Sequence, residues 1–260
     1  MGVTEQFAEV YLLRHGESTA NARGLFTGVL DPELTELGRE EAHRAAMLLL
    51  EAGVHPARVF CSALQRTTQT AQEMSAVMDL PSNLEIDWRL GERNYGALTG
   101  FSKTEVARRA GQARYRQWRR SYDVAPPPMS AAEMTRLRGR PPFNRLPARA
   151  LTATESLADV VRRITPFLDD VLLPAVGAGR PILVIAHGNS LRALLFVVQQ
   201  LTREQGGAAQ HPHRTPVALP VRAKRRPLPV AVLDLPRPRG GSRRRRSPSK
   251  PRGHLNGVPS

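Results

Sequence analysis

The sequence predicts an α/β fold, a three-layer α/β/α sandwich in which helices cover both faces of a mostly parallel central sheet. Short apolar runs alternate with amphipathic stretches of helical length between residues 10 and 201. A His-Gly pair directly follows the apolar run 181–186, and another follows the run 10–13 after one arginine, which places a histidine where each buried strand meets a loop. The stretch is long enough to form one domain with a sizeable core.

Four apolar runs predict the strands, and the amphipathic stretches between them predict the helices. The first helix has Thr35 as its N-cap and acidic residues, Glu40 and Glu41, near its start, where they favour a helix N-terminus. The expected strands are 10–13, 59–62, 84–87 and 181–186. The expected helices are 35–50, 64–78, 155–176 and 189–201.

Residues 93–150 depart from this alternation. They contain a basic helix with a tryptophan at 112–122, a proline break at 126–128, and a loop rich in Pro and Arg. Open α/β folds bind their ligands at the carboxyl edge of the sheet. We therefore expect an inserted cap of helices and loops over that edge, within one domain spanning residues 1–205.

The net charge of the chain divides unevenly at Gln205. The whole chain holds 38 Lys and Arg against 23 Asp and Glu, a formal charge of +15 that by itself is typical of a nucleic-acid binder. Residues 1–205 carry 25 basic and 22 acidic side chains, whereas residues 206–260 carry 13 and one. The second stretch also holds 10 of the 22 prolines and no Phe, Trp or Tyr, so we expect a basic, disordered tail.

The composition and the first residues also bear on where in the cell we expect the protein. No apolar run approaches the roughly 20 residues that a membrane helix needs. The first residues lack the basic and then apolar layout of a signal peptide. The single cysteine, Cys61, excludes an internal disulfide and a multi-cysteine metal site, and its apolar neighbours indicate a buried strand position. We expect a cytoplasmic protein with no membrane partner.

The residues after the first strand, Arg14-His15-Gly16, carry the first chemical signal. An imidazole is a good nucleophile near neutral pH, and a guanidinium beside it suits the binding of a phosphoryl group. Gly16 allows close backbone approach. Taken alone, the tripeptide fits a chance sequence in a turn as well.

The other strand ends favour the chemical interpretation. His187 and Gly188 follow the strand 181–186 and open a helix whose first backbone N–H groups suit an anion. Arg66 lies just after the strand 59–62, and Glu92 offers an acid or base at the next junction. Because the carboxyl ends of parallel strands meet at one edge, we expect these groups to form a phosphate pocket.

The two strand-end motifs, 13–18 and 186–194, resemble those of the histidine phosphatase superfamily. The motifs between them narrow the resemblance to the 2,3-bisphosphoglycerate-dependent phosphoglycerate mutases. These intervening motifs are Phe26-Thr27-Gly28, 34–38, 92–100, 118–120 and 126–128. The resemblance extends from about Glu9 to Gln205, with every motif in the order of the family.

The resemblance implies a catalytic set and a substrate-binding set. His15 would be phosphorylated during the reaction, and Glu92 would donate and accept the proton. The phosphoryl group would be held by Arg14, Arg66 and His187, with further hydrogen bonds from Asn21, Gly188 and Asn189. The substrate-binding positions of the family fall on Thr27, Gly28, Tyr95, Lys103, Arg119 and Arg120.

The resemblance also implies partners. The cofactor would be 2,3-bisphosphoglycerate, with no metal, and the chain would form a homodimer or homotetramer that interconverts 3- and 2-phosphoglycerate. The chemistry agrees, because phosphoglycerate carries a carboxylate besides its phosphate and so requires a second cationic group. Lys103, Arg119 and Arg120 would supply it from the cap, although the two arginines also fit a solvated helix face.

Two other functions stay open. A phosphatase would use the same phosphohistidine and release phosphate to water, but it would not need cations from the cap. A nucleic-acid-binding protein would act through the tail 206–260, because residues 1–205 have little excess charge.

The resemblance ends near Gln205, and the tail has features of a shifted reading frame. The family continues with Asn-Ile-Pro-Thr-Gly and a last strand containing Tyr-Glu-Leu. Permitted codons for residues 206–214, read one nucleotide later, spell Val-Ala-Leu-Leu-Asn-Ile-Pro-Thr. We hypothesise one inserted nucleotide near codon 206. A genuine Arg/Pro-rich extension is the alternative, and the nucleotide sequence of the gene distinguishes the two.

If the tail is read in a shifted frame, the chain lacks the last strand of the family. The tail lacks aromatic residues and has prolines every few positions, so we expect it to supply no strand in place of the family's last one. A sheet edge would then be exposed, with low stability and weak or absent mutase activity as the consequence.

Overall fold

A computed structural model describes residues 8–201, 217–223 and 226–233. Within these residues, six strands form one sheet in the order β3-β2-β4-β1-β6-β5. Every neighbouring pair is parallel except β5 and β6, which run antiparallel. The strands are β1 (Val10–Arg14), β2 (Arg58–Cys61), β3 (Glu85–Ile86), β4 (Ile182–Ala186), β5 (Val217–Ala223) and β6 (Arg226–Leu233).

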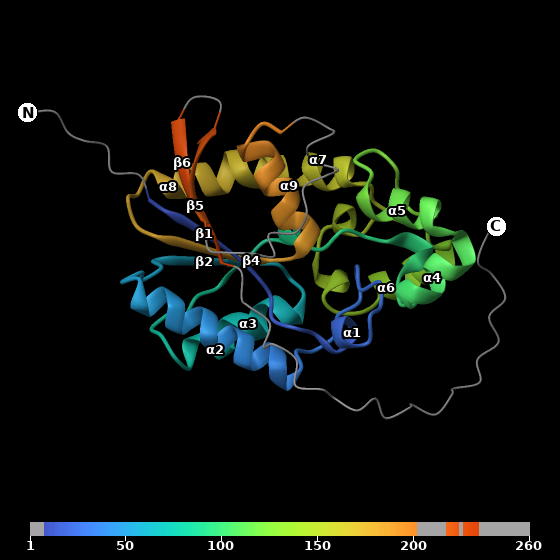
Figure 1. Ribbon diagram of the computed structural model, residues 1–260, viewed down its shortest axis with the longest axis horizontal. Coiled ribbons are helices and arrows are strands. Elements are labelled where there is room, and N and C mark those ends of the chain that lie inside the picture. Colours follow the sequence, from blue (N-terminus) through green and yellow to red (C-terminus); the bar gives the residue numbers. More distant parts are fainter. Residues whose placement is uncertain (1–7, 202–216, 224–225, 234–260) are drawn as a thin grey trace, which may run out of the picture.

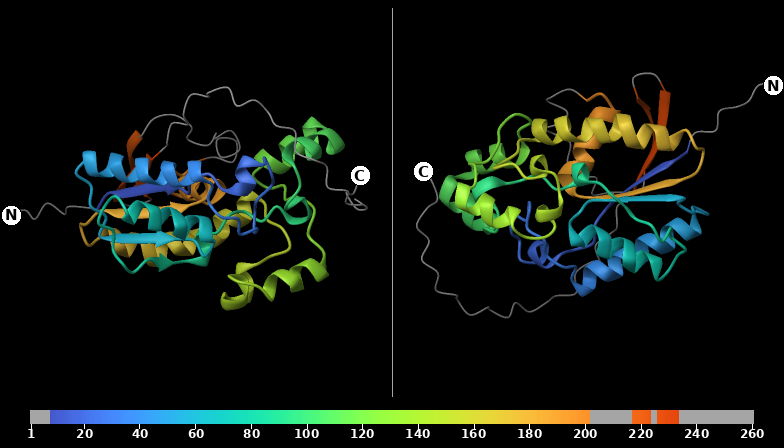
Figure 2. Two further views of the ribbon diagram at one scale, coloured as in Figure 1. Left: turned by 90° about the horizontal axis from the view of Figure 1, so that it is seen from below. Right: turned by 180° about the vertical axis from the view of Figure 1, so that it is seen from behind.

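Helices cover both faces of this sheet, so the predicted fold class is confirmed (Figure 1; Figure 2). On one face lie α2 (Glu36–Glu51) and α3 (Gln65–Ser75), and on the other lie α7 (Leu157–Phe167), α8 (Leu173–Val176) and α9 (Gly188–Val198). A short helix, α1 (Thr19–Ala22), follows β1. None of the helices in the described part of the chain combines the length and apolar character that crossing a bilayer requires.

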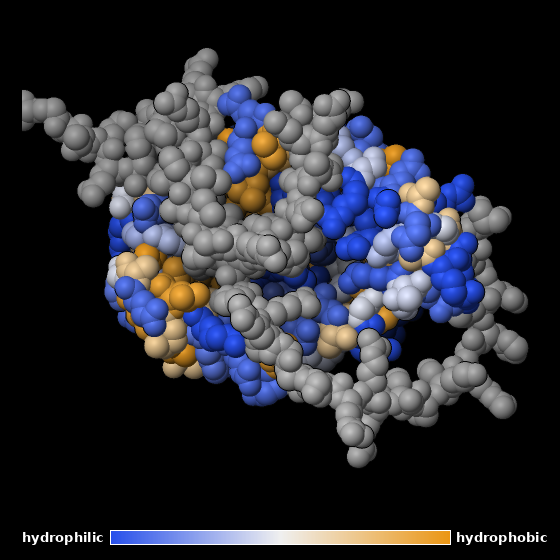
Figure 3. All heavy atoms as spheres, viewed as in Figure 1, coloured by the Kyte–Doolittle hydropathy of each residue, from blue (hydrophilic) through white to orange (hydrophobic). Residues whose placement is uncertain are grey.

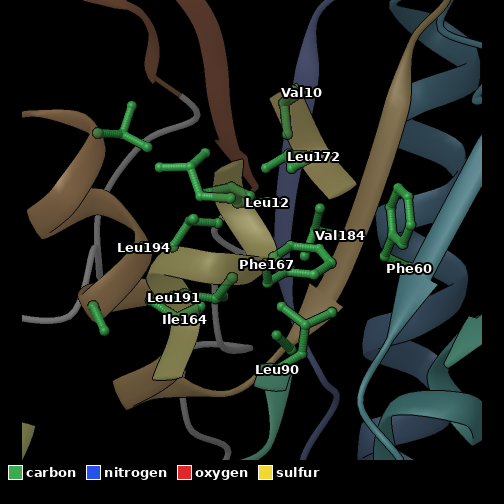
Figure 4. Close-up of a cluster of buried hydrophobic side chains, with 14 of the residues drawn as sticks. Val10, Leu12, Phe60, Leu90, Ile164, Phe167, Leu172, Val184, Leu191 and Leu194 are labelled. Atoms are coloured by element: carbon green, nitrogen blue, oxygen red, sulfur yellow. The ribbon is translucent and has the colours of Figure 1, made fainter. Parts of the chain in front are cut away.

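Alternation along the strands produces two apolar cores, one on each side of the sheet. Leu12, Phe60 and Val184 face the α7–α9 layer, where Phe60 and Phe167 meet edge to face with centroids 5.5 Å apart (Figure 4). The opposite side chains of the same strands join the α2–α3 layer. Both faces of β1, β2 and β4 are therefore buried, which fixes their register.

The predicted helix at 155–176 forms as three consecutive segments, α7, a π-helical turn at Leu168–Leu172, and α8. Pro166 lies inside α7 and Pro174 at the start of α8. Proline has no N–H to donate to the preceding turn, so the regular α-helical hydrogen bonding is interrupted at these positions.

The expected cap lies at one end of the molecule, beside the carboxyl ends of the strands (Figure 1). It contains α4 (Lys103–Ala110), α5 (Gln112–Arg120) and α6 (Ala131–Arg138). Hydrophilic residues cover much of its visible surface (Figure 3). Periodicity did not predict α1, α4 or α6, because each is short and buries at most one side chain.

The expectation that the tail supplies no strand is wrong for 217–223 and 226–233. The part of β6 that pairs with β1, Val230 to Leu233, is free of proline. Pro227 and Pro229 lie in the part that pairs with the outermost strand, β5. The free edge of β1 is therefore covered, which removes the reason given for low stability and activity. The rest of 206–260, where the frame hypothesis begins, lies outside the described residues.

Candidate active site

The register of β1 and β4 brings two histidines to the same edge of the sheet. Arg14 pairs with Ala186, so the next residue of each strand, His15 and His187, leaves the sheet at one level. The His15 backbone N–H donates to the Ala186 carbonyl at 3.1 Å. The two imidazole rings meet edge to face, with centroids 4.9 Å apart. Both rings are buried.

The His15 imidazole is held as a neutral nucleophile. Its Nδ1 lies 2.7 Å from the Gly16 carbonyl oxygen, an acceptor, so Nδ1 carries the proton and Nε2 bears the lone pair. Nε2 accepts from Arg66 Nε at 3.3 Å. Burial, and then the charges of Arg66 and Arg14, hold the pKa of His15 well below its ordinary value. The ring is therefore neutral and nucleophilic at neutral pH.

Two glycines allow the loop after β1 to approach α2 closely. A Cβ on Gly16 would lie 2.1 Å from the Gly38 carbonyl oxygen, and a Cβ on Gly38 would lie 2.1 Å from the Glu17 carbonyl oxygen. Thr35 caps α2 by accepting from the Gly38 N–H, which holds the helix start against this loop. The packing fixes the backbone of Gly16, whose carbonyl orients His15.

Arg66 comes from the first turn of α3 and is fully buried. Its Nη1 donates to the Leu30 carbonyl at 2.7 Å, and its Nη2 donates to the Gly28 carbonyl at 3.1 Å. Burial lowers its pKa to about 10, so the guanidinium keeps its charge at neutral pH. These two carbonyls orient the guanidinium, while the nearby carboxylates of Glu92 and Asp31 favour its charged form. Arg66 also lines the cavity, where a guanidinium suits an anion.

His187 lies deeper than His15. Its Nε2 is 2.7 Å from Ser62 Oγ, while its Nδ1 has no hydrogen-bond partner among the described residues. Burial, followed by the charge of Arg66, holds the pKa of His187 well below its ordinary value. Arg14 likewise has a buried Nε with no partner in the described part of the chain. Arg14 lines the cavity, so its unpartnered N–H indicates a site for an anionic ligand there.

Glu92 faces this group from the opposite wall. Its Oε1 accepts from the backbone N–H of Arg93 at 2.7 Å and from Asn189 Nδ2 at 3.0 Å. The Asn189 backbone N–H, at the start of α9, also donates to it at 3.3 Å. Asn189 Nδ2 contacts the Tyr95 hydroxyl at 3.0 Å as well. These hydrogen bonds hold the Glu92 carboxyl at the cavity wall, where it can exchange a proton with a ligand.

His15, Arg14, Arg66 and Glu92 line one cavity of about 190 Å³. Lys103 from α4 and Arg119 from α5 bring cap cations to the same cavity, and the Arg119 side chain donates to the Tyr115 hydroxyl at 2.9 Å. The cavity is lined by Arg14, His15, Asn21, Leu25, Thr27, Gly28, Arg66, Glu92, Tyr95, Lys103, Arg119, Gly188 and Asn189. No group of three or more His, Cys, Asp or Glu in the described residues is arranged to hold a metal ion.

Comparison with known proteins agrees with this geometry. The model of the histidine phosphatase superfamily, branch 1, matches residues 10–154. A 2,3-bisphosphoglycerate-dependent phosphoglycerate mutase of Thermobifida fusca is 46% identical over 187 residues, which are 71% of this chain and 75% of the relative. The enzyme of the same name from Mycobacterium leprae strain Br4923 is 40% identical over 222 residues, 85% of this chain and 89% of the relative.

The chain belongs to the histidine phosphatase superfamily. Its resemblance to the bisphosphoglycerate-dependent mutases, inferred above from short motifs, is confirmed. Among solved structures, the chain is similar to a mycobacterial glucosyl-3-phosphoglycerate phosphatase complexed with VO3, at 27% identity and a TM-score of 0.59, covering 76% of this chain and 85% of the other. Its complex with inorganic phosphate matches at 27% identity and a TM-score of 0.57, covering 76% and 82%.

Two of the residues that the superfamily resemblance assigned to the site do not line the cavity. They are His187, which packs edge to face against His15, and Arg120 at the end of α5. Asn21 Nδ2 donates to Thr27 Oγ1 at 3.4 Å within the cavity wall. Gly28 has a φ of +47°, a left-handed conformation that suits glycine, and a Cβ there would lie 3.3 Å from Tyr95 N.

Sequence reasoning missed three groups that position this superfamily site. Ser62 holds His187, and Leu25 lines the cavity. The buried pair of Arg163 and Glu155 fixes the Glu92 segment: Arg163 Nη2 donates to the Gly91 carbonyl at 2.9 Å, and Glu155 Oε2 accepts from the Asn94 N–H at 2.9 Å. Ser62 directly follows strand β2, so the expectation that strand ends carry the site residues could have identified it. No local sequence pattern predicts the roles of Leu25 or of the Arg163–Glu155 pair.

The Gly16 and Gly38 contact predicts an unusual stability change. Ala at a helical glycine normally stabilises a protein, yet Gly38→Ala should destabilise this one by about 1–3 kcal/mol through backbone overlap. Urea unfolding measures the difference. Gly139→Ala, where the new Cβ meets atoms only at 3.7 Å, is the matched control and should be neutral or stabilising. Equal effects of the two substitutions would contradict the account.

The charges around His15 predict its titration. NMR of the imidazole should show His15 neutral at pH values below about 6.5, the ordinary histidine pKa. Arg66→Gln should raise the pKa of His15, because it removes a cation that disfavours protonation. Arg44→Gln, which removes a cation from α2, is the control and should leave that pKa unchanged. Protonation of His15 at or above the ordinary value would show that the ring is not held as described.

Proposed function

We propose that this chain is a 2,3-bisphosphoglycerate-dependent phosphoglycerate mutase that interconverts 3- and 2-phosphoglycerate through phospho-His15. One observation carries the proposal. The cavity that holds His15, Arg14 and Arg66 also holds two cations from the cap, Lys103 and Arg119. A ligand with a phosphate and a carboxylate uses both sets of charges. The curated relatives named as mutases support the same function.

The first step is transfer of a phosphoryl group to His15. Nε2 forms a bond to phosphorus as the bond from phosphorus to the ligand oxygen breaks, and Glu92 donates a proton to that oxygen. Arg14 and Arg66 stabilise the charge on the phosphoryl oxygens. In the reverse direction, Glu92 removes the proton from the attacking hydroxyl, and phosphorus moves from Nε2 to oxygen. Positioning and charge supply the catalysis.

The cavity also suits the primer that the resemblance implies. 2,3-Bisphosphoglycerate supplies the phosphoryl group that first loads His15. The cations Arg14, Arg66, Lys103 and Arg119 line one cavity that contains a single carboxylate, Glu92. A polyanion is therefore matched by charge. We also propose a cytoplasmic homo-oligomer as its working form, following the family resemblance.

A phosphatase is the second candidate. The similarity of this chain to a solved mycobacterial glucosyl-3-phosphoglycerate phosphatase supports it. That similarity has a lower sequence identity than the similarity to the curated mutases. The two functions share phospho-His15 and differ in the acceptor, which is a hydroxyl of phosphoglycerate in one and water in the other. The cap cations favour the mutase, because they hold the organic acceptor against the phosphohistidine.

A coupled assay separates the two candidates. The chain should convert 3-phosphoglycerate to 2-phosphoglycerate faster than it releases inorganic phosphate, and 2,3-bisphosphoglycerate should accelerate only the conversion. His15→Ala should abolish both activities, because no other described group replaces the nucleophile. Phosphate release that exceeds conversion, with or without the primer, would identify a phosphatase instead.

A further inference from the structure

The carboxylate of Asp31 caps a helix that begins in another part of the chain. Asp31 Oδ1 accepts from the backbone N–H of Gln65, the first residue of α3, at 2.7 Å. Gln65 Nε2 also donates to the Asp31 carbonyl oxygen. The N-cap residue of α3 is Leu64, whose side chain makes no capping hydrogen bond. Asp31 therefore supplies a side-chain acceptor to a helix end whose own N-cap residue has none.

The capped turn carries Arg66, which lines the cavity. Its Nη1 and Nη2 donate to the carbonyls of Leu30 and Gly28, in the segment that ends at Asp31. The loop and the first turn of the helix thus hold each other through hydrogen bonds in both directions. Because Arg66 Nε lies 3.3 Å from His15 Nε2, a movement of this turn would move the guanidinium relative to the nucleophile.

Asp31 itself is half-buried and is not one of the described residues that line the cavity. Burial raises the pKa of its carboxyl, while the hydrogen bond from the Gln65 N–H and the charge of Arg66 oppose that rise. The Asp31 carboxylate in turn favours the charged form of Arg66. An effect of Asp31 on a ligand therefore passes through other residues, and Arg66 is the one that it orients.

We propose that Asp31 is a positioning residue that holds Arg66 against His15 by capping α3 from the neighbouring loop. This inference deepens the proposed function and rests on it for the ligand, because there Arg66 holds the transferred phosphoryl group. The capping hydrogen bond carries the effect, and the negative charge of Asp31 is secondary to it.

The pKa of His15 separates positioning from charge. The cation of Arg66 disfavours protonation of His15, so release of Arg66 should raise that pKa. Removal of a nearby negative charge alone would lower it instead. Asp31→Ala removes both the acceptor and the charge, and NMR of the imidazole should show the pKa of His15 raised. Asp31→Asn keeps an acceptor without the charge, so the pKa of His15 should not rise.

Inorganic phosphate is the probe for binding, because it engages the phosphoryl half of the cavity without a carboxylate. In calorimetric titration of the full chain, Asp31→Ala should weaken phosphate binding about tenfold, the loss expected for one hydrogen bond to a charged group. Asp31→Asn should stay within about threefold of the wild type, because Asn caps helices about as well as Asp.

A second variant breaks the same contact from the helix side. Gln65→Pro removes the N–H donor and leaves Asp31 in place. Proline is favoured at the first position of a helix, so this chain should fold. It should weaken phosphate binding as Asp31→Ala does.

A double variant shows whether Asp31 acts through Arg66. In the Arg66→Gln background, Asp31→Ala should cause no further loss of phosphate affinity. Ser130→Ala is the matched control, because it removes the hydroxyl that caps α6 in the cap by accepting from the Glu133 N–H at 3.2 Å. It should leave both the phosphate affinity and the pKa of His15 unchanged.

The proposal is overturned if Asp31→Ala binds phosphate as the wild type does, lowers the pKa of His15, or weakens binding equally without Arg66. A loss in Asp31→Asn as large as that in Asp31→Ala would overturn it too. The coupled mutase assay on the wild-type chain decides the proposed function separately. Phosphate binding that depends on Asp31 in a chain without mutase activity would support the positioning role and remove the mutase. Mutase activity with unchanged phosphate binding in Asp31→Ala would do the reverse.

Discussion

The candidate site depends on the parallel register of β1 and β4, which delivers His15 and His187 to one edge of the sheet at the same level. Both faces of these strands are buried, so a slip by one residue would move apolar side chains into the wrong layer. The register thus brings the His15 ring against His187 and within hydrogen-bond distance of Arg66. The Gly16 carbonyl then fixes the proton of His15 on Nδ1. The rest of the pocket is built around that ring.

The second constraint is the burial of the Arg66 guanidinium beside His15. The carbonyls of Leu30 and Gly28 orient Arg66, and the nearby carboxylates of Glu92 and Asp31 favour its charged form against the cost of burial. In the function we propose, mutase and phosphatase share phospho-His15, and the cap cations Lys103 and Arg119 distinguish them by holding an organic acceptor next to it.

The sequence alone predicts the parts of this arrangement that follow from strand ends. His15, Arg66 and His187 each come just after an apolar run, and parallel strands bring such positions together without further information. The contact between Gly16 and Gly38 joins segments distant in sequence, and so do the hydrogen bonds from Arg163 to Gly91 and from Asn94 to Glu155. No periodicity in the sequence predicts them. Strand β6 was missed because its proline-free pairing segment, Val230 to Leu233, is short and lies within a stretch rich in proline and arginine.

In the function we propose, His15 Nε2 is the nucleophile, because Nδ1 donates its proton to the Gly16 carbonyl and leaves the lone pair on Nε2. The most direct measurement is phosphorus and nitrogen NMR of the chain after brief reaction with 2,3-bisphosphoglycerate, with His15→Ala as the control. The account predicts one phosphohistidine, on Nε2 of His15, and none in the control. Phosphate on Nδ1 of His15, or on any other residue, would contradict it.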